Sequence, residues 1–167
     1  SSGDELVPPN EKLTGGMIRD INLYTIGALV EGLSALPTLF PRVPDEFDEL
    51  LDVGKRAIEV SDMVVFTAGS SISSRDLTAQ VINKMGSPGV LIHGLSVKPG
   101  KPTILGFSAG KPIIGLPGNP VSAITIFKAV VDPLLRLISG QKIFPGNKIV
   151  EAILNSNLSS TSGRTDY

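Results

Sequence analysis

The sequence predicts a three-layer α/β domain, in which helices cover both faces of a mostly parallel sheet. Strand-like apolar runs alternate along the chain with segments whose apolar residues recur at helical spacing. This alternation favours parallel pairing, because each connecting helix returns the chain to the same end of the sheet. The 167 residues are 41% hydrophobic and 19% charged, which is enough for one sizeable core.

Two helices are predicted in the first third of the chain, after a loop over residues 1–16. Asp20 is expected to cap the first helix, and an extended piece over 38–43 follows it. Asp45 or a neighbour is expected to begin the second helix, whose apolar residues follow i, i+3, i+4, i+7 spacing. The apolar side of the first helix holds Ile21, Ile26, Leu29, Val30 and Leu33, and that of the second holds Phe47, Leu50, Leu51, Gly54, Ala57 and Ile58.

The rest of the chain supplies most of the predicted sheet. Residues 63–66 form a short apolar run, typical of a strand buried on both faces. Apolar runs on either side of 108–110 predict a β-hairpin. The other expected elements are a loop over 67–75, a helix over 76–85, a strand over 90–97, hairpin strands over 103–107 and 111–116, and a helix from Pro120 that ends before Gly140.

Composition and charge exclude several classes of function. A formal net charge of −1 gives no general attraction to nucleic acid or to membrane surfaces. No apolar run approaches the roughly 18 residues of a membrane-spanning helix. Cysteine is absent, and His93 is the single histidine, so thiolate and histidine-cluster metal sites are excluded. A cytoplasmic protein without nucleic-acid or membrane partners is expected.

Five segments are expected where strands end or helices begin. In a doubly wound sheet such segments gather in one crevice, and that crevice is the usual ligand site. Their convergence on one edge therefore predicts a binding cleft, with Asp45, Asp76, Lys98 and Asn119 around it. The segments are 1–5, 43–45, 67–71 with Asp76, 98–102 and 115–123.

The first candidate anion-binding element is the Gly/Ser loop with Gly69, Ser70 and Ser71. Glycine permits close approach of the backbone, and backbone N–H groups ahead of a helix attract phosphate or oxyanions. A flexible serine linker is the alternative interpretation. The strand expected before this loop and the helix expected after it favour the binding interpretation.

The second candidate is the basic loop Lys98-Pro99-Gly100-Lys101-Pro102. Prolines restrict the backbone, so the two ammonium groups are presented from a stiff loop and can neutralise a phosphate or an oxyanion such as molybdate. A solvated turn with incidental charge is the alternative.

The third candidate is the stretch Pro117-Gly118-Asn119-Pro120. Asn119 suits an N-cap, and Pro120 suits the first helical position, where its missing N–H costs nothing. Gly118 allows close approach of a ligand, and Pro117 fixes the direction of entry. We therefore expect a helix N-terminus, with its partial positive charge, to point at the crevice.

These motifs resemble the molybdopterin molybdenumtransferase family, which includes the E domain of gephyrin. The similarity runs in the family's order from residue 1 to about 140, and its last two motifs together are highly specific. The residues that carry it are Ser2-Gly3-Asp4-Glu5-Leu6, Ile18-Arg19-Asp20 with Asn22, the basic loop, and Gly115-Leu116-Pro117-Gly118-Asn119-Pro120-Val121-Ser122-Ala123.

The resemblance implies a molybdopterin-binding domain of an elongated homodimer. Family members insert molybdenum from molybdate into adenylylated molybdopterin and release AMP, with Mg²⁺ involved. By motif, Asp45, Asp76, Lys98 and Lys101 correspond to catalytic positions, and Asp4, Glu5 and Asp76 to metal-binding ones. The pterin-binding positions are Gly69, Ser70, Ser71, Pro117, Gly118, Asn119 and Pro120. A molybdopterin adenylyltransferase is an implied partner.

The resemblance also predicts the domain organisation. Residues 1–140 correspond to the binding domain without its opening strand, which family members have just before the Ser-Gly-Asp-Glu motif. Residues 141–167 correspond to a linker and the start of a small C-terminal β domain. Two other functions stay open: a related adenylylating or nucleotide-cleaving enzyme, and a gephyrin-like scaffold that anchors receptors.

Overall fold

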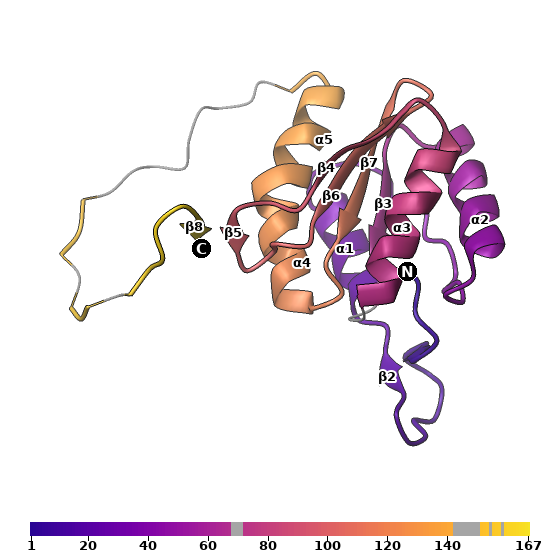
Figure 1. Ribbon diagram of the computed structural model, residues 1–167, viewed down its shortest axis with the longest axis horizontal. Helices are drawn as coiled ribbons and strands as arrows, with labels where there is room; N and C mark the ends of the chain where they lie inside the picture. Colours follow the sequence, from indigo (N-terminus) through magenta and orange to yellow (C-terminus); the bar gives the residue numbers. More distant parts are fainter. Residues whose placement is uncertain (68–71, 142–150, 154, 158) are drawn as a thin grey trace.

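The computed structural model describes residues 1–67, 72–141, 151–153, 155–157 and 159–167. A four-stranded sheet with strand order β3-β7-β6-β4 forms the centre of the fold (Figure 1). Its elements are α1 (Asn22–Glu31), α2 (Phe47–Val60), β3 (Val64–Thr67), α3 (Ile72–Met85), β4 (Pro88–His93), β6 (Ile104–Ser108), β7 (Lys111–Leu116), α4 (Pro120–Ile126), the π-helical turn η1 (Phe127–Val131) and α5 (Asp132–Ile138). Two short two-stranded sheets lie outside the central sheet. One pairs β1 (Leu6–Val7) with β2 (Ile18–Arg19), and the other pairs β5 (Val97–Lys98) with β8 (Thr165–Asp166).

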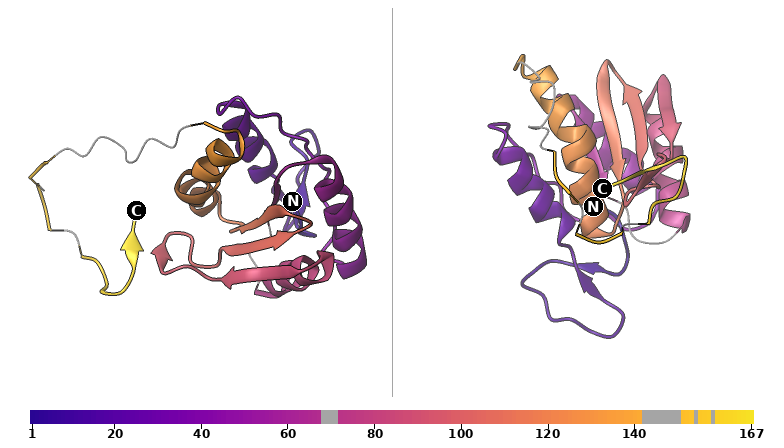
Figure 2. Two further views of the ribbon diagram at one scale, coloured as in Figure 1. Left: turned by 90° about the horizontal axis from the view of Figure 1, so that it is seen from above. Right: turned by 90° about the vertical axis from the view of Figure 1, so that its left-hand side faces the viewer.

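Helices cover both faces of the sheet, as expected (Figure 2). β3 and β7 are parallel, whereas β6 is antiparallel to both β7 and β4. Three of the four strands therefore run in one direction, although only one pair of neighbours in the sheet is parallel. The reversed strand β6 belongs to the predicted hairpin, whose turn residues Ala109 and Gly110 have φ angles of 51° and 76°.

Each face of the sheet has its own apolar core, because alternate strand residues point to opposite faces. In β3, Val64 and Phe66 pack with α2 and α3, while Val65 packs with α1 and α4. The buried residues of the first core are Val43, Leu50, Leu51, Ala57, Ile58, Val64, Phe66, Val81, Ile82, Ile104 and Ile113, and those of the second are Ile26, Ile114, Leu116, Ala123, Ile126, Phe127 and Val131.

Several expected boundaries move. α3 begins at Ile72 and not at Asp76, so Asp76 is the fifth residue of the helix and not its cap. The strand expected over 90–97 ends at His93, because Gly94, with φ of +97°, turns the chain and donates its N–H to Thr103 O at 2.8 Å.

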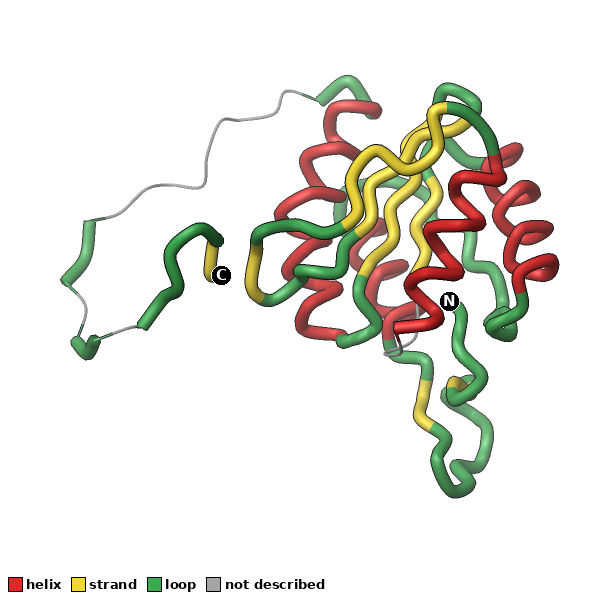
Figure 3. The backbone as a smooth tube through the Cα atoms, in the orientation of Figure 1, coloured by secondary structure: helices red, strands yellow, loops and turns green. Residues whose placement is uncertain are grey.

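Outside the three layers, the loop between β1 and β2 extends beyond the end of the sheet (Figure 3). Arg19 holds this loop by donating to the carbonyl oxygens of Pro9 and Glu11, at 2.6 and 2.9 Å. At the other end of the chain, β8 runs parallel to β5, which brings the C-terminal segment to the basic loop. In the described ranges, no helix is long and apolar enough to cross a membrane.

Candidate functional site

The opening residues bind to the end of β3 and to the segment before α2. Ser2 N–H donates to Thr67 O at 3.0 Å, and Gly3 N–H donates to Val43 O at 3.3 Å. The hydroxyl groups of Ser1 and Thr67 are 2.8 Å apart. The Ser-Gly-Asp-Glu motif is therefore fixed at the carboxyl end of β3, which is the end where ligands bind in α/β folds.

Two of the predicted acidic residues meet there. Asp45 N–H donates to Asp4 Oδ1 at 3.3 Å, which joins the first loop to the start of α2. Asp4 is exposed, and Glu5 and Asp45 are half-buried. Within the described ranges, no group of three or more acidic or histidine side chains is arranged to hold a metal ion.

The proline-rich stretch has the predicted geometry. Asn119 Oδ1 accepts the N–H of Ser122 at 3.2 Å, and Pro120 takes the first turn of α4. The helical run continues without a break through η1 and α5 to Ile138. Pro117 is buried, while Asn119 is exposed. The N-terminus of this helix therefore faces outward at the end of β7, with a partial positive charge.

Asn22 connects the proline-rich stretch to α1. Its Nδ2 donates to Gly118 O at 2.8 Å, and the side chain is buried. Just before it, Asp20 Oδ1 accepts the N–H of Leu23 at 3.1 Å. Asp20 therefore satisfies an N–H of the first turn, as expected, although the cap position itself is one residue later, at Ile21. The backbone N–H of Asp20 also donates to Val7 O, in the opening loop, at 2.9 Å. α1 thus links the opening loop to the proline-rich stretch.

The basic loop lies beside the middle of the last helical run and contacts the C-terminal strand. A Cβ on Gly100 would come within 2.4 Å of Ile126, so only glycine permits this close packing. The N–H of Tyr167 donates to Lys98 O at 2.9 Å. Hydrogen bonds from Arg164 and Ser160, together with the positive charges of Arg164 and Lys98, lower the pKa of Asp166. Lys98 and Lys101 are both exposed.

The remaining predicted residues lie apart from these contacts or outside the described ranges. Asp76 is exposed on α3, whose first turn lies at the same end of the sheet as Ser1 and the start of α4 (Figures 1 and 2). Gly69, Ser70 and Ser71 fall in 68–71, which is outside the described residues. The structure joins Asp4 with Asp45 and Asn22 with Gly118, so a single cleft shared with Lys98 and Asp76 stays a prediction.

Sequence reasoning left Asn22 and Thr67 out of the candidate site residues. The sequence did indicate a role for Asn22, since it is a polar residue at the start of an apolar helix and belongs to a motif. Nothing in the sequence indicated a role for Thr67, because its role depends on Ser1 and Ser2, which lie more than sixty residues away in the chain.

The chain is similar to known molybdopterin-binding proteins. A family model described as a probable molybdopterin binding domain matches residues 1–137. The molybdopterin molybdenumtransferase of Haemophilus influenzae is 35% identical over 167 residues, which cover all of this chain and 41% of that relative. The same-named protein of a Nostoc species is 36% identical over 84% of this chain and 33% of its own length. The chain thus spans about two fifths or less of these relatives.

Solved structures of molybdopterin biosynthesis proteins superpose on this chain. A molybdopterin biosynthesis protein MoeA from Pyrococcus horikoshii superposes with a TM-score of 0.75 and 38% identity, over 84% of this chain and 34% of its own. The molybdopterin biosynthesis enzyme MoaB of Thermus thermophilus superposes with a TM-score of 0.58 over 74% of this chain and 87% of its own. At 19% identity, this second similarity shows the fold alone.

Proposed function

Because the chain belongs to the molybdopterin-binding domain family, we propose that it is the pterin-binding domain of a molybdopterin molybdenumtransferase. The reaction is insertion of molybdenum from molybdate into adenylylated molybdopterin, with release of AMP. The observation that carries this proposal is the match over residues 1–137, which includes the acidic opening loop, the basic loop and the proline-rich helix start. The contacts of Asn22 with Gly118 and of Asp4 with Asp45 support it, because they assemble motifs distant in sequence.

The anionic parts of the substrate set the proposed roles. The helix N-terminus at Asn119 and Pro120 takes a phosphate or oxyanion through its partial positive charge. Lys98 and Lys101, both exposed, neutralise molybdate or pyrophosphate oxygens. Gly69, Ser70 and Ser71 add backbone and hydroxyl donors. Pro117 and Pro120 form the proline wall of the proposed site, and Gly118 allows close approach of the pterin.

The acidic residues at the end of β3 can supply one or two carboxylate ligands to Mg²⁺. Mg²⁺ commonly takes one or two carboxylates and completes its shell with substrate phosphates and water. The carboxylates of Asp4 and Asp45 are the proposed pair, because the backbone N–H of Asp45 donates to Asp4 Oδ1 and brings the two residues together. Glu5 and Asp76 are the further candidates. When bound, the cation would neutralise charge on the pyrophosphate. The protein's part is to hold the carboxylates at the carboxyl end of β3.

The proposed assembly is a homodimer supplied with adenylylated pterin by a molybdopterin adenylyltransferase. This partner follows from the chemistry, because a preceding reaction must attach AMP to the pterin. The scaffold function stays an alternative that no contact among the described residues favours.

The experiment is native mass spectrometry of the 167-residue chain with adenylylated molybdopterin, with molybdopterin, and with AMP as a control for nucleotide binding alone. We expect a one-to-one complex with the adenylylated pterin. Binding of AMP and the adenylylated pterin with equal affinity would contradict pterin recognition and favour a nucleotide-binding function.

A further inference from the structure

The basic loop is held at its centre by the helix that begins at the proline-rich stretch. Gly100 is buried and has a φ angle of +112°, a backbone conformation that favours glycine. A Cβ at this position would collide with the side chain of Ile126 in α4. Lys98 and Lys101, which flank the glycine, are exposed. The middle of the loop is therefore packed against the protein, while its two charged residues stay accessible to a ligand.

Thr103 holds the carbonyl group of the same glycine. Its side chain is fully buried, and its Oγ1 donates to Gly100 O at 2.7 Å. The backbone N–H of Thr103 donates to the same oxygen at 3.2 Å. The carbonyl oxygens of Thr103 and Lys101 accept the N–H groups of Gly94 and Leu95, each at 2.8 Å. These hydrogen bonds join the basic loop to itself and to the segment that follows β4.

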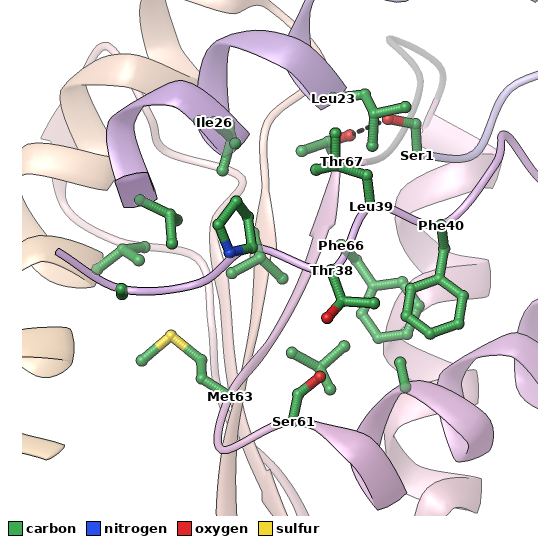
Figure 4. Close-up of a pocket in the computed structure, with 18 of the residues that line it drawn as sticks. Ser1, Leu23, Ile26, Thr38, Leu39, Phe40, Ser61, Met63, Phe66 and Thr67 are labelled. Atoms are coloured by element: carbon green, nitrogen blue, oxygen red, sulfur yellow. Dashed lines mark hydrogen bonds between the residues drawn. The ribbon is translucent and has the colours of Figure 1, made fainter. Parts of the chain in front are cut away.

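Ile126 is itself fixed, because it is fully buried in the second apolar core. Ile26 of α1 belongs to the same core, and Met63 packs against it (Figure 4). Ile126 ends α4, and at a rise of 1.5 Å per residue it lies about 9 Å along the helix axis from Pro120, where α4 begins. The same helix therefore presents an N-terminus with partial positive charge and supports the basic loop at a fixed distance from it.

We propose that Thr103 and Ile126 are positioning residues for the binding of an anionic substrate group by Lys98 and Lys101. Both are buried and act through Gly100, Thr103 by its hydroxyl group and Ile126 by packing. A loop that is ordered before the ligand arrives loses less conformational freedom on binding, so its affinity is higher. Because lysine side chains are flexible, the backbone that carries them is the part that the fold can order in advance. This inference rests on the proposed function, which assigns anion binding to the two lysines.

The test compares variants of the 167-residue chain by calorimetric titration with adenylylated molybdopterin. Thr103→Val keeps the branched shape and removes the hydroxyl group, and we expect the affinity to fall about tenfold. Thr103→Ser keeps the hydroxyl group and should retain an affinity within about twofold of the wild type. Thr125→Val is the matched control, because Thr125 Oγ1 donates to the carbonyl oxygen of Val121 in α4 at 2.8 Å and not to the basic loop. It should leave the affinity unchanged.

A second pair of variants tests the packing, and it decides the question if Thr103→Val does not fold. Ile126→Val removes the Cδ1 methyl group, one of the atoms nearest to Gly100. Ile114→Val makes the same deletion at another buried position of the second core. Both substitutions should lower the stability to a similar extent. Only Ile126→Val should also weaken binding, by about threefold or more, because only Ile126 supports the loop.

The order of the loop is measured in the same variants without ligand. Nitrogen-15 relaxation of the Gly100 and Lys101 amides should give order parameters of about 0.85 in the wild type and lower values in Thr103→Val. Hydrogen exchange at the amide of Leu95, which donates to Lys101 O, should be faster in that variant.

Two results would overturn the inference and leave the proposed function intact: wild-type affinity in both Thr103→Val and Ile126→Val, or a loop that is as mobile in the wild type as in Thr103→Val. Failure of the wild-type chain to bind adenylylated molybdopterin would instead overturn the proposed function, and with it the anion site that these residues are inferred to position.

Discussion

Asn22 and Gly118 are 96 residues apart in the chain, yet the amide of Asn22 donates to the carbonyl oxygen of Gly118 at 2.8 Å. This bond fixes the start of α1 against the residue that precedes the Asn119 cap. It stabilises a peptide unit between two prolines and so sets the direction in which α4 begins.

Asn22→Ala should destabilise the protein by about 1–3 kcal/mol, because it leaves a part-buried carbonyl without its donor. Urea unfolding followed by circular dichroism measures this change. Asn10→Ala is the matched control, since Asn10 is exposed, and should leave the free energy of unfolding nearly unchanged. Equal effects of the two substitutions would show that the bond does not contribute to stability.

Asn119 offers a way to separate capping from anion binding. Asn119→Ala should cost about 0.5–2 kcal/mol of stability through loss of the cap. Asn119→Asp should keep the cap and the melting temperature, yet it should weaken binding of adenylylated molybdopterin, because it places a negative charge at the proposed anion site. Calorimetric titration measures the binding. Unchanged affinity in Asn119→Asp would remove this helix start from the site.

The exposed lysines should matter for binding more than for folding. Lys98→Ala and Lys101→Ala should each weaken binding of the adenylylated pterin or molybdate by about 1–3 kcal/mol. The melting temperature should change little, because exposed lysines contribute little to stability. Lys84→Ala, at an exposed position on α3, is the control. If the double variant keeps full affinity, the loop acts only as a turn.

Asp76 and Asp4 can be compared as Mg²⁺ ligands in the longer protein that carries this domain. Since α3 begins at Ile72, Asp76→Asn does not disturb a helix cap and should keep the melting temperature. Asp4→Asn keeps an oxygen that can accept the N–H of Asp45. Each should lower Mg²⁺-dependent AMP release, because an amide supplies no negative charge to the cation. AMP release with normal Mg²⁺ dependence would remove that residue from the metal site.

The features that the sequence determined are those set within a few residues. Asn119 and Pro120 specify a helix start through their own side chains, and the structure has both in the expected roles. The 108–110 turn formed as expected between two apolar runs, because Gly110 adopts positive φ without steric cost. The period of the apolar residues likewise predicted two helices and a strand where the structure has α1, α2 and β3.

Tertiary packing decided what depends on residues distant in the chain. α3 extends back to Ile72 through two serines, whose weak helix propensity predicted a loop, because burial of Val81 and Ile82 outweighs propensity. The bond of Asn22 to Gly118 and the bond of Ser2 to Thr67 each need elements that meet only after folding. Local propensities act over a few residues, whereas burial and hydrogen bonding between layers act on the folded chain. The sequence therefore determined the elements, and the tertiary structure decided how the site is assembled.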